Sequence, residues 1–316
     1  ASTGGHVRVS AGHDDEDTGG SISLTTGLGS TKSSGSVVVQ TFNAGSAGIS
    51  GGLTFFTGTT SAGASGSIAL STGDATGGKA GDFVLSVGTG SATAGGDIIA
   101  TAGTSTPNTG GSISMSTGAG TATSSGSLLF RTVDAGVSGM SGAIRFTTGT
   151  TSSGTSGLVS IATGSATDGK AGSLIMSVSS GDTLEGGAVT VTAGETTANS
   201  QVAGTISITS GYGSSTTAGQ GGHFKVDAGL GNGGTGGSIS FTTGTSSLTS
   251  SGSVIVQSRN AGVGGISGSL NFMTGTTSSG SSGSIRLNTG AATDGRGGNI
   301  VVSVKSGTAA TGGDII

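Results

Sequence analysis

The sequence predicts an all-β fold, a flattened two-sided β-solenoid with about fifteen residues per coil and about twenty coils. Two observations carry this prediction. Glycine recurs at one register from Gly5 to Gly313, and an apolar side chain stands two residues after each of these glycines. In all twenty complete units a second apolar side chain follows two positions later. Self-similarity at a short fixed period is typical of architectures in which neighbouring repeats supply one another's core.

The unit 19–33, GGSISLTTGLGSTKS, defines the positions 1 to 15 used below. Position 2 is glycine, and the spacing of the apolar positions 4 and 6 predicts that both face inward from one β-strand. Position 9 is glycine in fifteen of the twenty complete units, which predicts a chain turning out of the strand with a positive φ. Stacked coils would lie about 4.8 Å apart. The sequence leaves the handedness of the coil open.

A longer period lies above the short one. The chain is predicted to form one continuous solenoid over residues 1–316 and to be a segment of a longer repeat protein, because residues 312–316 open a further unit. Its repeat sets are 19–109, 110–202 with extra coils at 203–235, and 236–316.

Each set contains one sixteen-residue unit whose extra residue falls in the turn. We expect the apolar side chain that ends this turn to pack over a coil end or a neighbouring turn, with contact to another rod as the alternative. These side chains are Ile49, Met140 and Ile266.

Composition narrows the function classes. Glycine makes up 70 of 316 residues, charged residues 8 % and aromatic residues 3 %, with one proline and no cysteine. Glycine without a strict triplet period excludes collagen. A formal net charge of −4 with scattered signs predicts no nucleic-acid partner, and the absence of a long apolar run predicts no membrane insertion. Without cysteine, disulfides and thiolate metal sites are excluded.

Position 5 should point outward, and it turns apolar in particular coils at a spacing near three coils. Such a row is a candidate surface for lateral self-association, the alternative being scattered exposed valine and isoleucine. The row consists of Val38, Val84, Ile99, Leu129, Ile175, Ile255 and Val301.

The acidic cluster Asp14, Asp15, Glu16 and Asp17 could offer oxygens to Ca²⁺, but it lacks the spacing of a calcium loop. A solvated acidic turn is the preferred interpretation. The turns that contain Asp168 with Lys170 and Asp294 with Arg296 are expected to hold exposed ion pairs of small energy.

The three histidines, His6, His13 and His223, have no second ligand at metal-binding spacing. Serines are abundant, but no Ser/His/Asp arrangement is recognisable. The glycine string 231–237 precedes no predicted helix, so it is not a phosphate loop. We therefore predict no catalytic residues, no cofactor, no metal site and no enzymatic activity.

The strings GGSISLTTGLGSTKSSGSV, SGSIALSTGDATGGKAGDFVLSVGTG and SGMSGAIRFTTGTTSSGTSG resemble very long Gly/Ser/Thr-rich repeat proteins predicted in stramenopile algae and similar protists. The resemblance covers essentially the whole chain. It implies an extracellular or cell-surface fibre of the wall, adhesive-thread or flagellar-hair type, and it carries no site residues.

The expected function is accordingly that of a structural protein that forms or stiffens an extracellular filament by self-association. The alternative is a cell-surface adhesin stalk or a solenoid that binds polysaccharide. O-glycans on the Ser/Thr-rich turns are conceivable for a secreted chain. Ice binding is disfavoured, because outward position 7 includes Gln40, Phe56 and Arg131.

Overall fold

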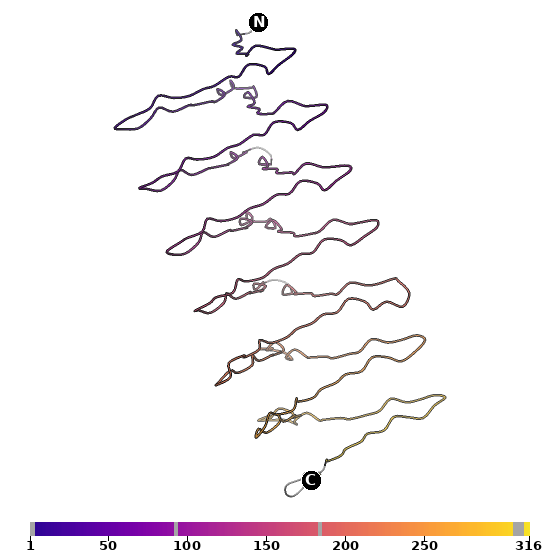
Figure 1. Cartoon of the computed structure of the whole chain (residues 1–316). Coiled ribbons are helices and arrows are strands. Elements are labelled where there is room, and N and C mark those ends of the chain that lie inside the picture. Colours follow the sequence, from indigo (N-terminus) through magenta and orange to yellow (C-terminus); the bar gives the residue numbers. More distant parts are fainter. Residues whose placement is uncertain (1–3, 92–93, 183–184, 306–312) are drawn as a thin grey trace. The chain divides into compact units, whose positions relative to one another are not determined.

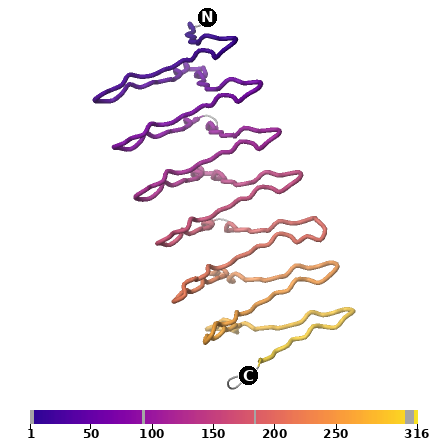
Figure 2. Tube along the Cα trace, in the orientation of Figure 1, coloured from indigo at the N-terminus to yellow at the C-terminus, as the bar shows by residue number. Residues whose placement is uncertain are grey.

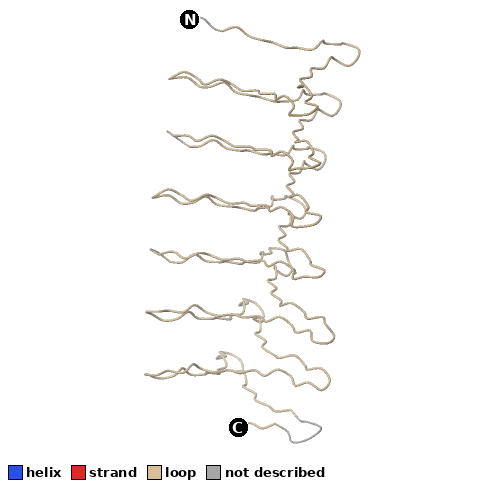
Figure 3. Cartoon of the chain, turned by 90° about the vertical axis from the view of Figure 1, so that its left-hand side faces the viewer, coloured by secondary structure: helices blue, strands red, loops and turns tan. Residues whose placement is uncertain are grey.

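The computed structural model describes residues 4–91, 94–182, 185–305 and 313–316. Over these ranges the backbone forms neither a helix nor a β-strand, and Figure 1 and Figure 3 draw it as loop. The prediction of an all-β fold, and of a β-solenoid in particular, is therefore wrong. The period of the sequence is seen in the structure as a repeated succession of bends and closed loops.

The backbone hydrogen bonds show why the strands do not form. A β-ladder pairs N–H and C=O groups of neighbouring segments, which for stacked coils lie about fifteen residues apart. In the described residues, each backbone hydrogen bond joins groups only three to eleven residues apart. Glycine loses more conformational freedom on ordering than any other residue. Closing short loops orders fewer residues of a glycine-rich chain than pairing whole strands would, so its cost in conformational entropy is lower.

The apolar side chains at positions 4 and 6 do not form the predicted inner core. The exposed fraction is 54 % for Ile22 and 79 % for Leu24, and the larger hydrophobic side chains of the described residues range from 46 % at Val304 upward. Position 4 is generally less exposed than position 6. The two apolar positions of a unit thus differ in exposure, but no side chain in the described part of the chain is buried.

One tight bend marks almost every unit. The bends fall at about positions 12 to 14, and Figure 2 shows them recurring along the Cα trace. Examples are 15–17, 30–32, 106–108 and 293–295. Each unit therefore has a segment half, positions 2 to 9, and a bend half, positions 10 to 15.

A hydrogen bond between two glycines closes many of the bend halves. The N–H of the position-2 glycine donates to the carbonyl of the position-9 glycine in the preceding unit, as from Gly20 to Gly12 over 3.0 Å and from Gly111 to Gly103 over 2.9 Å. We call the enclosed residues a glycine-closed loop. Such loops flank the first coil of each predicted repeat set on both sides. The donor–acceptor pairs are Gly20–Gly12, Gly35–Gly27, Gly111–Gly103, Gly126–Gly118, Gly237–Gly229 and Gly252–Gly244, with Gly204–Gly194 and Gly222–Gly211 around the extra coils.

The glycine register has a steric cause at this closure. A Cβ added to Gly126 would lie 3.3 Å from Thr117 Cβ, and one added to Gly187 would lie 2.7 Å from Val178 Cγ1. The same neighbour, the position-8 side chain of the preceding unit, faces every position-2 glycine from Gly20 to Gly313. At Gly96 and Gly187 the position-8 side chain leaves no room for a Cβ, whereas at Gly81 and Gly298 a Cβ would be in ordinary van der Waals contact.

Partial burial is confined to two positions of the repeat. The half-buried residues of the described chain stand either at position 8, such as Thr57 and Thr243, or at position 11, such as Gly29 and Thr196. At position 8 the side chain covers the glycine of the next unit. At position 11 the residue lies inside the bend.

Position 11 also explains how the bends are held. In several units it carries a polar side chain that accepts N–H groups of the bend, a common way for Ser, Thr and Asp to stabilise turns. Ser105 Oγ accepts from Asn108 N at 3.2 Å, Ser246 Oγ from Thr249 N at 2.9 Å, Thr196 Oγ1 from Ala198 N at 3.3 Å, and Thr277 Oγ1 from Ser279 N at 3.4 Å. Apart from Asp14, described below, position 11 in the other described units is glycine, alanine or a threonine, Thr60 or Thr151.

The positive φ angles lie in the bends and not at position 9, which corrects the prediction for the position-9 glycines. Among the described residues they occur at Gly154 (130°), Gly264 (80°), Gly280 (130°) and Ser200 (60°). The position-9 glycines serve through their carbonyl groups, as acceptors of the loop-closing bond.

The sixteen-residue units place their extra residue in the turn, as predicted. There a short turn is closed over three residues, from Gly48 N to Gly45 O at 3.4 Å and from Gly265 N to Gly262 O at 3.1 Å. The apolar side chain that follows does not pack over a coil end, because Ile49 is 99 % exposed. That part of the prediction is wrong for Ile49 and equally for Met140 and Ile266.

The chain divides into two units, Ala1–Val159 and Ser160–Ile316. Glycine-closed loops and position-11 caps occur in both of them. The local devices of the repeat are therefore the same in each unit.

Candidate functional site

Side chains at alternate positions of the segment half lie side by side. Lys225 Nζ and Asp227 Oδ2, at positions 5 and 7, form an ion pair of 2.6 Å. Ser240 Oγ and Thr242 Oγ1 are 3.5 Å apart at the same two positions of another unit. In these two units the odd positions thus form a polar side of the segment, which is the alternation that the sequence predicts.

The acidic cluster is the densest group of ionisable side chains, and its geometry is that of a capped bend. Asp14 stands at position 11, the place held by Ser105 and Ser246 in other units. Its Oδ1 accepts the backbone N–H of Glu16 at 2.9 Å and of Asp17 at 2.6 Å. Those two hydrogen bonds favour the charged carboxylate and lower the pKa of Asp14 below its ordinary value.

The neighbours of Asp14 are likewise engaged within the turn. Asp17 Oδ1 accepts from the backbone N–H of Thr18 at 2.9 Å, and His13 Nε2 lies 2.8 Å from Asp15 Oδ1. All of these groups are exposed. The preferred interpretation, a solvated acidic turn, agrees with this geometry, since the carboxylate oxygens bond to the bend itself.

No group of three or more His, Asp or Glu side chains in the described residues is placed to hold a metal ion. His6 and His223 occupy position 3 of equivalent units, where both are exposed. His13 instead pairs with Asp15, a contact that the sequence analysis did not find. The sequence could have predicted this contact, because His13 and Asp15 are two residues apart, as Lys225 and Asp227 are.

The ion pairs differ from the predicted ones. Among the described residues they are His13–Asp15, Lys79–Asp82 and Lys225–Asp227, and neither Asp168–Lys170 nor Asp294–Arg296 is among them. Lys79 and Asp82 join the last position of one unit to the third of the next, with Nζ 2.8 Å from Oδ1. All three pairs are exposed, so each contributes little to stability.

The apolar row at position 5 is fully available to solvent. The exposed fraction of its side chains lies between 74 % at Val38 and 83 % at Ile99. In these coils positions 4, 5 and 6 are nearly always all apolar, so both sides of the segment are apolar. Each of these segments is therefore a short, exposed apolar stretch of its own.

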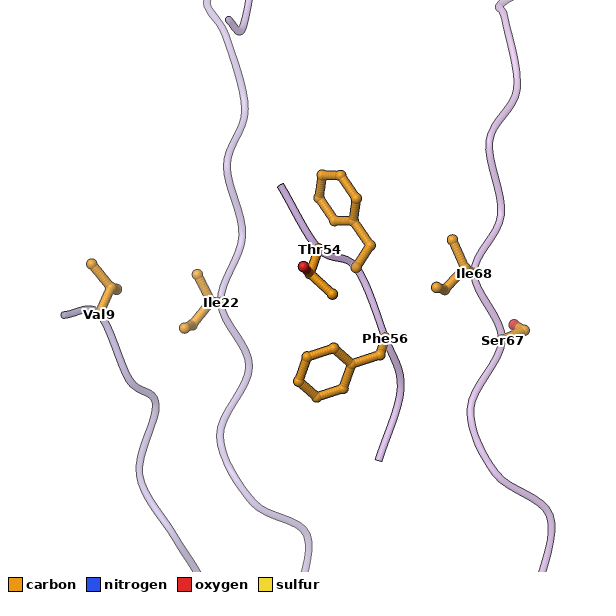
Figure 4. A pocket seen from close by; sticks show the side chains of 7 residues that line it. Val9, Ile22, Thr54, Phe56, Ser67 and Ile68 are labelled. Atoms are coloured by element: carbon orange, nitrogen blue, oxygen red, sulfur yellow. The ribbon is translucent and has the colours of Figure 1, made fainter. Parts of the chain in front are cut away.

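Two hollows in the described part of the chain have a defined lining. One is lined by polar residues of a single sixteen-residue unit, Gln257 to Asn260. The other lies within residues 9–68, and Figure 4 shows the side chains that face it, which are apolar groups and two hydroxyls without a charged group among them. Its lining side chains are Val9, Ile22, Thr54, Phe55, Phe56, Ser67 and Ile68, and all of them are exposed. Neither hollow brings together an acid, a base and a nucleophile.

No helix in the described ranges has the length and apolar character needed to cross a membrane. Comparison with protein-family models, with curated proteins and with solved structures finds no match to this chain. The exposed apolar segments and the closed loops are therefore the features of the chain that bear on its function.

Proposed function

We propose that this chain is a structural protein that builds or stiffens an extracellular or cell-surface filament by associating with further copies of itself. The observation that carries the proposal is the exposure of the apolar segment halves. Every large hydrophobic side chain in the described residues is exposed by 46 % or more. Contiguous apolar surface on a soluble chain marks a site of association.

The apolar segments offer part of the energy that association requires. Burying one large apolar side chain contributes about 1.5–3 kcal/mol, so the three side chains of a single segment, such as Leu128, Leu129 and Phe130, would contribute about 5–9 kcal/mol. Bringing two partners together costs about 4–15 kcal/mol. One such segment therefore offsets the lower part of this cost, and further segments of the same kind add to it.

Charge does little to oppose this association. The formal net charge is −4 over 316 residues, and charged residues are 8 % of the chain. The acidic and basic groups that do occur are partly paired within their own units, as in Lys225 with Asp227.

The closed loops recur beside the first coil of each repeat set, so each set carries the same locally ordered elements. Each loop is held by bonds within itself and requires no partner. The extracellular setting is supported by the resemblance to algal repeat proteins, which implies a surface fibre.

Electron microscopy combined with sedimentation tests the proposal. Purified chain should assemble into long filaments above a threshold concentration, with sedimenting material increasing at the expense of monomer. A chain that remains monomeric at all accessible concentrations would contradict self-association. Monomers that instead sediment with an added cell-wall polysaccharide would support the adhesin or polysaccharide-binding alternative.

A further inference from the structure

The bend 232–234 contains the one Asn-Gly step of the sequence, Asn232–Gly233. Both residues are exposed. The bend belongs to a glycine-closed loop whose base is the hydrogen bond from Gly237 N to Gly229 O at 2.9 Å. Asn232 therefore sits at the tip of a loop that is fixed at its ends.

The interior of this loop is crowded, whereas its tip is open. A Cβ added to Gly231 would lie 2.8 Å from Gly234 O, so the base leaves no room for a side chain. A Cβ added to Gly233 would meet nothing within 4 Å. Among the described residues, the N–H of Gly233 enters no backbone hydrogen bond and the Asn232 side chain enters no side-chain hydrogen bond.

We propose that Asn232 is a site of spontaneous deamidation. The backbone nitrogen of Gly233 attacks Cγ of Asn232, forming an N–Cγ bond, while the Cγ–Nδ2 bond breaks and ammonia leaves with the proton from the Gly233 nitrogen. The product is a five-membered succinimide. Water then opens the ring at either carbonyl, which yields aspartate or isoaspartate at position 232. No oxidant or reductant is required.

Glycine after the asparagine makes this step accessible. The ring can close only if the following peptide nitrogen approaches Cγ, and glycine offers neither a Cβ to obstruct this approach nor a restricted φ. The other asparagines precede bulkier residues: Asn43 and Asn260 precede alanine, Asn108 and Asn288 precede threonine, Asn199 precedes serine, Asn271 precedes phenylalanine and Asn299 precedes isoleucine. Asn232 should thus react well ahead of them.

The modification changes both charge and geometry. Each event replaces a neutral amide by a carboxylate, which moves the formal net charge from −4 to −5. The isoaspartate product also inserts a methylene into the main chain of a loop closed by Gly237 and Gly229. Material that has aged would therefore carry an altered loop at one defined place in the repeat array.

Peptide mapping by mass spectrometry after incubation in mildly alkaline buffer tests the proposal. The mass gain of an amide-to-acid conversion should appear at Asn232 at least about tenfold faster than at Asn43 or Asn260 in the same sample, which corresponds to a barrier about 1.36 kcal/mol lower. The variant Gly233→Ala should reduce the rate at Asn232 to that of Asn43. Because the space beside Gly233 is empty, this substitution leaves the loop intact.

Equal rates at Asn232 and Asn43 would overturn the proposal, as would an unchanged rate in Gly233→Ala. Mapping by peptide, rather than a total isoaspartate assay, is required because Asp168–Gly169 and Asp294–Gly295 lie in bends and can form the same ring with loss of water. Those two sites give no change in mass, so they cannot be mistaken for Asn232. The measurement does not depend on whether the chain assembles.

Discussion

In the bend half of many units, backbone groups and polar side chains bond to one another, whereas in the segment half the apolar side chains face solvent. Ser246 accepts N–H groups of its own bend, and Gly252 donates to Gly244 across the base of the same loop. Ile22 and Leu24, in a segment half, touch no core. The difference teaches that order within the single chain comes from the loops, while the surface that requires a partner lies on the segments.

The strongest test removes apolar groups from one half at a time. The triple variant Val38→Ser, Leu129→Ser, Ile255→Ser should raise the threshold concentration for assembly by roughly a thousandfold or more, because each lost burial removes about 1.5–3 kcal/mol. Serine is the natural residue at position 5 in other units, for example Ser23 and Ser114. Sedimentation over a concentration series measures the threshold.

Its matched control removes three equally exposed leucines from the bend half, in the variant Leu28→Ser, Leu230→Ser, Leu248→Ser. This variant should assemble with nearly the wild-type threshold. If both triples raised the threshold equally, the segments would have no special part in association, although self-association itself would stand.

A second test opens one loop. A Cβ on Gly204 would lie 2.9 Å from Gly194 N and 3.2 Å from Ala193 Cβ, so Gly204→Ala should break the bond from Gly204 N to Gly194 O. We expect a loss of about 1–3 kcal/mol in the free energy of local opening. Hydrogen exchange at the amide of residue 204 reports it. In the control Gly194→Ala, on the other side of the same bond, the new Cβ meets nothing within 4 Å and protection should persist.

A third test relieves strain in the bend 198–200. Ser200 adopts φ 60°, a left-handed conformation that costs a residue with a Cβ about 1–2 kcal/mol. Ser200→Gly should therefore stabilise this loop by about 1 kcal/mol, visible as slower exchange at the amide of residue 204. Thr197→Gly, at a neighbouring residue without a positive φ, should weaken the loop instead, and a stabilising result there would show that strain is not the cause.

The smallest expected effect is the acid response of the first bend. The lowered pKa of Asp14 means that its carboxylate stabilises the bend above the ordinary value of 3.8, and that this contribution disappears as the pH falls through the lowered pKa. The amide chemical shifts of Glu16 and Asp17 should move together in that range. Asp14→Ser keeps an oxygen acceptor that does not titrate, so the part of these shift changes that follows Asp14 should be lost.

The sequence predicted the repeat and the alternation of side chains between the two sides of a segment. It did not predict correctly which backbone groups form hydrogen bonds with one another. The period reappears as one bend per unit, and the ion pair of Lys225 with Asp227 confirms that alternate residues share a side. Strand pairing was predicted wrongly because hydrogen bonding between coils is a non-local property. A period of fifteen fits stacked coils and locally closed loops equally well.

The capping role of position 11 could have been found in the sequence. Aligned units show Asp14, Ser105, Thr196 and Ser246 at this position, the side chains that accept N–H groups in turns. The close approach of position 2 to position 8 could not have been found in the sequence, because glycine at this register is equally expected on the face of a β-strand. The 2.7 Å between a Cβ added to Gly187 and Val178 Cγ1 shows that crowding by position 8 is the cause there.

The glycine-closed loops also bear on how a gene for such a protein can change in length. Each closing bond joins a unit only to the unit before it, so unequal recombination that adds or removes whole units leaves the remaining bonds with their own partners. A compact globular domain does not tolerate such events, since its core is shared by distant parts of the chain. Unit number can thus drift between alleles while the conformation of each unit is inherited unchanged.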